Sequence, residues 1–139
     1  MKHNHVIKVR GFHTDMFGHV NNARYLEFLE EARWEFLEDH LEYKQWQKLG
    51  RAFIVVNINI NYRQPSKLGE ILDIESYVSK IGSKSGTIHQ NIYKKDSKIK
   101  TTDADITFVV IDTKSNKSVR IEGEIRKIFQ NLLHSNIEF

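Results

Sequence analysis

The chain has 139 residues, of which 40% are hydrophobic and 28% charged, and its formal net charge is +3. This length predicts a single domain over residues 1–139 with a sizeable core, and the composition excludes a disordered chain. The lack of cysteine excludes disulfides, thiolate zinc sites and cysteine nucleophiles, and so small a net charge predicts no binding to nucleic acid.

The sequence also lacks the usual signals for membranes and metals. No apolar run approaches the roughly 20 residues that a membrane-spanning helix needs. The N-terminus, Met-Lys-His-Asn-His, lacks the apolar stretch of a secretory signal. The seven histidines follow no regular ligand spacing. We therefore expect a cytoplasmic protein with no membrane span and no metal site.

The first third of the chain predicts a strand, a loop and a long helix. Loose alternation indicates a strand over residues 5–12, and a polar loop over 13–21 follows. A helix is predicted over about 22–40, because Asn21 or Asn22 can cap the free N–H groups of its first turn. Apolar residues at helical spacing mark the face expected to meet the core: Tyr25, Leu29, Ala32 and Phe36.

The rest of the chain predicts a sheet. Residues 41–51 are expected to form a connector whose aromatic side chains pack against the end of the helix. Four strands with alternating apolar and polar residues follow at 52–63, 70–81, 87–95 and 99–112, and a short helix is predicted over about 123–133. Tight turns join the strands and imply an antiparallel sheet. We therefore predict an α+β fold in which a curled antiparallel β-sheet wraps around one long central α-helix.

The loop before the helix is the candidate active site. It carries an acid, Asp15, and a histidine, His19, directly ahead of a helix N-terminus. Such a terminus presents unpaired N–H groups and partial positive charge, which suit a developing oxyanion. An aspartate in a loop is also typical of a simple turn, so the pattern alone leaves both interpretations open.

The same stretch carries a longer motif. The pattern Asp-Thr-Asp-x-x-Gly-His-Val-x-Asn, then Tyr-Leu-x-x-x-Glu-x-Ala-Arg on the helix, is matched at Thr14, Asp15, Gly18, His19, Val20, Asn22, Tyr25, Leu26, Glu30, Ala32 and Arg33. On these residues the chain resembles hotdog-fold acyl-CoA thioesterases of the 4-hydroxybenzoyl-CoA thioesterase-like family. The resemblance extends over nearly the whole chain. It departs at His13, where that family has its first Asp.

The resemblance implies a chemistry for the loop. The chain would hydrolyse an acyl-CoA thioester to a free carboxylic acid and CoA, with Asp15 as nucleophile or general base. His19 would be a base, a partner of Asp15 or a packing residue. The backbone N–H groups of Val20, Asn21 and Asn22 are candidate oxyanion donors. No cofactor is implied, since coenzyme A enters as part of the substrate.

Substrate-binding residues follow from the same resemblance. Phe17 and Tyr25 are candidates to shape the acyl pocket. The phosphates of coenzyme A require basic or hydroxyl side chains. The candidates are Lys80, Lys84 and Ser85 near one hairpin, with Arg63 and Lys67 at the preceding turn.

Hotdog proteins pair their sheets, so the resemblance also implies a homodimer or homotetramer with its active site at the dimer seam. An alternative is an acyl-carrier-protein thioesterase, since the His-Val-Asn-Asn string resembles the plant enzymes of that class. Phe17 and Gln64 stand where those enzymes have Asn and Glu. A non-catalytic acyl-binding protein is the other alternative, while the position of Asp15 argues against a hydratase or dehydratase.

Overall fold

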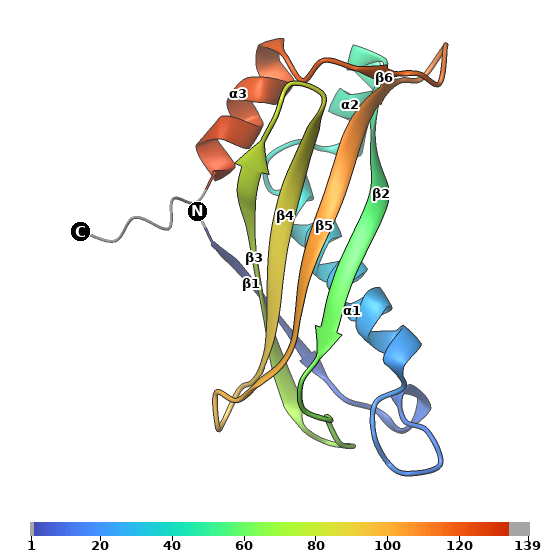
Figure 1. The fold of residues 1–139 in the computed structure, drawn as a ribbon, viewed down its shortest axis with the longest axis vertical. Coiled ribbons are helices and arrows are strands. Elements are labelled where there is room, and N and C mark those ends of the chain that lie inside the picture. The colour runs from blue at the N-terminus through green and yellow to red at the C-terminus, as the bar shows by residue number, and fades with distance from the viewer. Residues whose placement is uncertain (1, 134–139) are drawn as a thin grey trace, which may run out of the picture.

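The computed structural model describes residues 2–133, which form one six-stranded sheet with three α-helices (Figure 1). None of the helices in this range is long and apolar enough to cross a membrane. In chain order the elements are β1 (His3–Lys8), a 3-10 turn (Gly11–His13), α1 (Asn22–Glu38), α2 (Tyr43–Leu49), β2 (Arg51–Tyr62), β3 (Ile71–Ile81), β4 (Ser85–Lys94), β5 (Lys100–Asp112), β6 (Ser118–Val119) and α3 (Gly123–Leu132).

The sheet is antiparallel, as the sequence predicts. Its strand order is β1-β3-β4-β5-β2, and the short β6 pairs with β5. Two hairpins, β3–β4 and β4–β5, make its centre. The strands on either side of α1 in the sequence, β1 and β2, become the two outer strands of this order.

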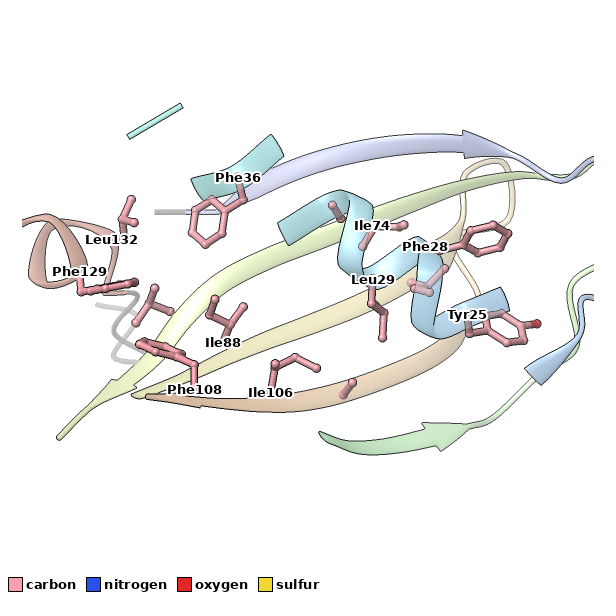
Figure 2. Packing of buried hydrophobic residues seen from close by; sticks show 14 of the residues in the cluster. Tyr25, Phe28, Leu29, Phe36, Ile74, Ile88, Ile106, Phe108, Phe129 and Leu132 are labelled. Atoms are coloured by element: carbon pink, nitrogen blue, oxygen red, sulfur yellow. The ribbon is translucent and has the colours of Figure 1, made fainter. Parts of the chain in front are cut away.

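The core lies between α1, α3 and one face of the sheet. Tyr25, Leu29, Ala32 and Phe36 are all buried, which confirms the predicted helix face. Figure 2 shows this helix face over side chains from β3, β4 and β5. Full burial of an aliphatic or aromatic side chain contributes about 1.5–3 kcal/mol. The sheet residues on this face are Leu72, Ile74, Val78, Ile88, Ile92, Ala104, Ile106, Phe108 and Val110.

A buried polar bridge also joins α1 to the sheet. The guanidinium Nη1 of Arg33 donates to Gln90 Oε1 at 3.0 Å. Gln90 Nε2 in turn donates to the Leu29 carbonyl at 3.0 Å and to Ser76 Oγ at 2.9 Å. Burial lowers the pKa of Arg33. Because the buried polar groups have partners, the bridge avoids much of the penalty of burying them.

Two sequence predictions are wrong in detail. The 41–51 connector contains α2, whose start is fixed by the backbone N–H of Glu42 donating to Gln45 Oε1 at 2.8 Å. The short C-terminal helix predicted over about 123–133 is confirmed as α3, so the sequence missed only α2 among the helices of residues 2–133. In β2, a bulge between Val55 and Asn57 changes the alternation, so that Ile54 and Val56 point outward, 40% and 56% exposed.

The buried helix face gives the first test. Leu29→Ala should lower the free energy of unfolding by about 2–5 kcal/mol, because Leu29 is fully buried and its truncation leaves a cavity. Urea denaturation measures the change. Leu26→Ala is the control, since Leu26 is 37% exposed on the same helix and should lose about 1 kcal/mol or less. Equal losses in the two variants would contradict this packing.

Candidate active site

The loop ahead of α1 is closed by its own backbone. Asp15 N–H donates to the His19 carbonyl at 2.8 Å, and Gly18 N–H donates to the Asp15 carbonyl at 3.1 Å. Gly18 has φ +75°, a left-handed conformation that glycine adopts without strain. The loop therefore holds the aspartate in one place although it lies at the surface.

The carboxylate of Asp15 has two distinct oxygens. Oδ1 accepts from the backbone N–H groups of Phe17 at 2.9 Å and His19 at 3.3 Å. Within residues 2–133, Oδ2 has no hydrogen-bond partner, and the residue is exposed. One oxygen thus fixes the orientation of the group and the other remains available to a substrate or to water.

The N-terminus of α1 lies directly after this loop. Asn21, one of the two predicted caps, is the N-cap of α1. Its Oδ1 accepts from Ala23 N–H at 3.0 Å. The N–H groups of Val20 and Asn21, predicted as oxyanion donors, already donate to the carbonyls of Ser66 and His13, both at 2.8 Å. This part of the prediction is wrong. Of the three candidates, only Asn22 has an N–H with no acceptor among the described residues.

Two tyrosines join the helix start to the connection between β2 and β3. Tyr25 OH accepts from Ser66 N–H, and Tyr62 OH donates to the Asn22 carbonyl, both at 3.1 Å. The two rings lie 5.5 Å apart, and burial raises the pKa of Tyr62. Tyr25 is only 3% exposed. Within one chain Tyr25 therefore connects the start of α1 to Ser66, and its role in shaping the acyl pocket stays a prediction.

The histidines of the loop have unequal roles. His13 Nδ1 accepts from Arg10 N–H at 2.9 Å, and its ring packs edge-on against Phe28. The pKa of His13 is lowered mainly by burial and, second, by the positive charge of Arg24. The His19 ring has no hydrogen bond within residues 2–133, and this residue binds Asp15 through its backbone instead.

The structure brings only some of the other predicted site residues to Asp15 within one chain. Phe17 is close by, at the loop tip and 77% exposed. Arg63 forms an ion pair with Asp103 and lowers the pKa of that carboxyl. Lys80, Lys84 and Ser85 flank the β3–β4 turn at the other end of the sheet (Figure 1). This separation contradicts one shared site in a single chain.

A groove that the sequence did not predict lies between α1, α2 and β2. Its volume is about 810 Å³. Arg33 and Glu30 contribute its polar side, and its apolar lining includes Trp34, Leu37, Trp46, Phe53 and Val55. Sequence reasoning missed it because residues 41–51 were not expected to be helical, although Glu42 and Gln45 have the spacing of a helix start. In the described range, no three acidic or histidine side chains group to hold a metal ion.

Comparison with known proteins agrees with the fold. Residues 9–129 match the family model of the thioesterase-like superfamily. The long-chain acyl-CoA thioesterase FadM of Escherichia coli (strain K12) is 47% identical over 127 residues, which are 91% of this chain and 96% of that protein. A chloroplastic acyl-acyl carrier protein thioesterase of Arabidopsis thaliana is 27% identical over 133 residues, 94% of this chain and 68% of its own length.

Among solved structures, that of Escherichia coli YbaW has a TM-score of 0.87 and 46% identity, covering 94% of this chain and 98% of its own. The chain therefore belongs to the thioesterase-like superfamily. Its antiparallel sheet with few helices agrees with the hotdog fold that the sequence predicts.

The lowered pKa of His13 gives a pH prediction. At pH values between the ordinary histidine pKa of 6.5 and the lower pKa of His13 in the folded chain, the unfolded chain binds more protons than the folded chain. The stabilisation that His13 provides is therefore complete above this pH window and is lost as the pH falls through it. His13→Gln keeps an acceptor for Arg10 N–H but does not titrate. Urea denaturation at pH 7.5 and 5.0 should show a smaller loss of stability in the variant. An equal loss of stability in the variant and the wild type would contradict a contribution of His13 to this pH dependence.

Proposed function

We propose that this protein hydrolyses acyl-CoA thioesters to a free carboxylic acid and CoA. The observation that carries the proposal is the carboxylate of Asp15, which has one oxygen held by two backbone N–H groups and the other without a partner among residues 2–133. It lies one short loop away from the unoccupied N–H of Asn22 at the start of α1. Membership of the thioesterase-like superfamily and the 47% identity to FadM support it.

Two routes use this geometry. In one, Asp15 Oδ2 attacks the thioester carbonyl, the CoA thiolate leaves, and water then hydrolyses the mixed anhydride. In the other, Asp15 takes a proton from water as that water attacks, and the tetrahedral intermediate then collapses with departure of the CoA thiolate. In both routes the carbonyl oxygen gains negative charge, which Asn22 N–H and the helix terminus stabilise. Water is the only co-reactant, so the reaction needs no cofactor.

The acyl chain is proposed to be long. The name of the relative FadM specifies long-chain acyl-CoA. In this chain the groove of about 810 Å³ offers an apolar lining from α1, α2 and β2, which suits a hydrocarbon tail. Arg33 and Glu30 lie along its wall.

The active form is proposed to be a homodimer or a pair of such dimers. The edge strand β2 is 12 residues long and exposes Ile54, Val56 and Ile58. Its outer backbone groups are unpaired within residues 2–133, and such an edge readily pairs with another chain. Antiparallel pairing about a two-fold axis would set one chain's β3–β4 turn nearer its partner's Asp15, which keeps Lys80 and Lys84 as candidates across the seam.

The acid gives the central test of activity. Asp15→Asn keeps the shape of the side chain and removes its charge, so hydrolysis should fall about 10²–10⁴-fold by loss of the base or nucleophile. Thiol release from short, long and aromatic acyl-CoAs, measured beside the wild type, checks this and names the substrate class. Glu124→Gln, an exposed acid in the first turn of α3, is the matched control and should retain full activity.

Unchanged turnover in Asp15→Asn would exclude both routes. Absence of turnover by the wild type on every acyl-CoA would favour acyl-carrier-protein substrates instead, which the relative from Arabidopsis thaliana acts on by its name. Failure on those substrates too would leave an acyl-binding role without catalysis. The order of the tests therefore separates the three functions.

The assembly has its own test. Val56→Lys places a charge on the exposed edge of β2 and should convert the oligomer to monomers with little remaining thioesterase activity. Light scattering and thiol release measure the two effects. Val6→Lys makes the same change on the other edge strand, β1, where valine is 49% exposed, and should leave both unchanged. A fully active monomer would refute the proposed seam.

A further inference from the structure

Four large apolar side chains are exposed beside the candidate active site. Phe12, Met16, Phe17 and Leu68, together called the apolar tip, are each between 61% and 89% exposed. Met16 and Phe17 directly follow Asp15 in its loop, and Phe12 lies in the 3-10 turn before it. Single exposed apolar residues are ordinary on protein surfaces, whereas a group of them indicates an interaction surface.

Backbone contacts between separate segments bring Leu68 to the other three residues. Lys67 pairs with His19 in an isolated β-bridge. On the other side of Leu68, Gly69 N–H donates to the Val9 carbonyl at 2.9 Å. Leu68 therefore lies between the loop ahead of α1 and the segment that follows β1. These segments form the end of the molecule that is drawn lowest in Figure 1.

The same end of the molecule carries the positive charge of the chain. Residues 8–20, the β2–β3 connection at 66–71 and the β4–β5 turn at 94–100 together contain seven lysines and arginines and three acids. The turn adjoins the connection, because Lys95 N–H donates to the Ile71 carbonyl at 2.8 Å. This surplus of four positive charges exceeds the formal net charge of +3 for all 139 residues, so the rest of the chain is slightly acidic.

Most of these basic side chains face solvent. Glu70 is already paired with Lys94 at 3.1 Å. Five of the basic side chains are exposed and have no ion-pair partner within residues 2–133: Lys8, Arg10, Lys67, Lys95 and Lys98. Apolar side chains next to free cations are typical of a surface that meets anionic lipid, since the apolar groups enter the interface and the cations meet the headgroups.

We propose that this end of the molecule binds an anionic phospholipid bilayer, with the apolar tip inserted at the level of the headgroups. Side chains that protrude from neighbouring loops suit a fluid lipid surface, whereas a protein partner would need a shaped surface to receive them. The consequence for catalysis rests on the proposed function: the Asp15 loop would meet acyl thioesters whose chains already lie in the bilayer.

Sedimentation with lipid vesicles tests the binding directly. One set of vesicles contains phosphatidylcholine and phosphatidylglycerol in equal amounts, and the other contains phosphatidylcholine alone. We expect binding to the anionic vesicles to be at least about tenfold stronger than to the neutral ones, because the cations contribute only where the lipid is anionic. High salt should weaken the binding to anionic vesicles.

Two variants separate the apolar from the electrostatic contribution. Phe12→Ser with Leu68→Ser should weaken binding to anionic vesicles about tenfold or more, since two apolar side chains no longer enter the interface. Lys95→Glu with Lys98→Glu should weaken it to a similar extent by charge reversal. Circular dichroism and urea denaturation check that both variants fold as the wild type does.

Each variant has a matched control outside this end of the molecule. Val6→Ser removes an exposed valine of β1 that is not part of the apolar tip, and it should bind vesicles as the wild type does. Lys114→Glu with Lys117→Glu reverses two exposed lysines on the β5–β6 turn, at the opposite end of the sheet, and should also leave binding unchanged.

Thioester hydrolysis gives a second readout. The Phe12/Leu68 variant should hydrolyse a soluble short-chain acyl-CoA at the wild-type rate and a long-chain acyl-CoA embedded in anionic vesicles about tenfold more slowly. Sedimentation needs no turnover. Vesicle binding by a protein that hydrolyses no thioester would therefore refute the proposed hydrolysis and leave the lipid surface intact.

Three results would overturn the inference. The first is equal or absent binding to the two kinds of vesicle, and the second is an equal loss of binding in the variants and their controls. The third is a different occupant of the apolar tip. A change of oligomeric state in the Phe12/Leu68 variant would assign this surface to a second copy of the chain, and a variant-sensitive complex with an acidic acyl carrier protein, without vesicle binding, would assign it to that protein.

Discussion

The packing of one face of α1 against the sheet is the constraint on which the rest of this structure depends. Leu29, Ala32 and Phe36 are fully buried along the helix, so its axis is held over much of its length. A helix held in this way must begin at a fixed point. That point is the end of the sheet where β2 finishes. There the N–H of Asn22, which has no acceptor in the described part of the chain, lies directly after the Asp15 loop in the sequence.

Polar contacts make this packing specific. An apolar interface alone tolerates small rotations and shifts of a helix, whereas a buried polar group is satisfied in few arrangements. The bridge from Arg33 through Gln90 to Ser76 ties the middle of α1 to β3 and β4. At the helix start, Tyr25 and Tyr62 make the equivalent connection to the strand ends. The geometry of the candidate active site is therefore a consequence of contacts made along the whole helix.

The two ends of the sheet also differ in chemistry. The end near Asp15 carries the candidate catalytic carboxylate and the N-terminus of α1, both of which are polar. The groove between α1, α2 and β2 is mainly apolar and opens beside the unpaired edge of β2. An acyl thioester has the same division, with a polar arm on one side of the carbonyl and a hydrocarbon chain on the other.

The sequence by itself determined what local pattern encodes. The long helix with a cap at Asn21 or Asn22, the antiparallel strands and the loop carrying Asp15 all follow from spacing and turn residues within short windows. Only the tertiary structure decided which N–H groups remain free, because the acceptor for Val20 is Ser66, more than 40 residues away in the chain. The bulge in β2 and the groove beside α2 likewise depend on what distant segments pack against, which no local pattern records.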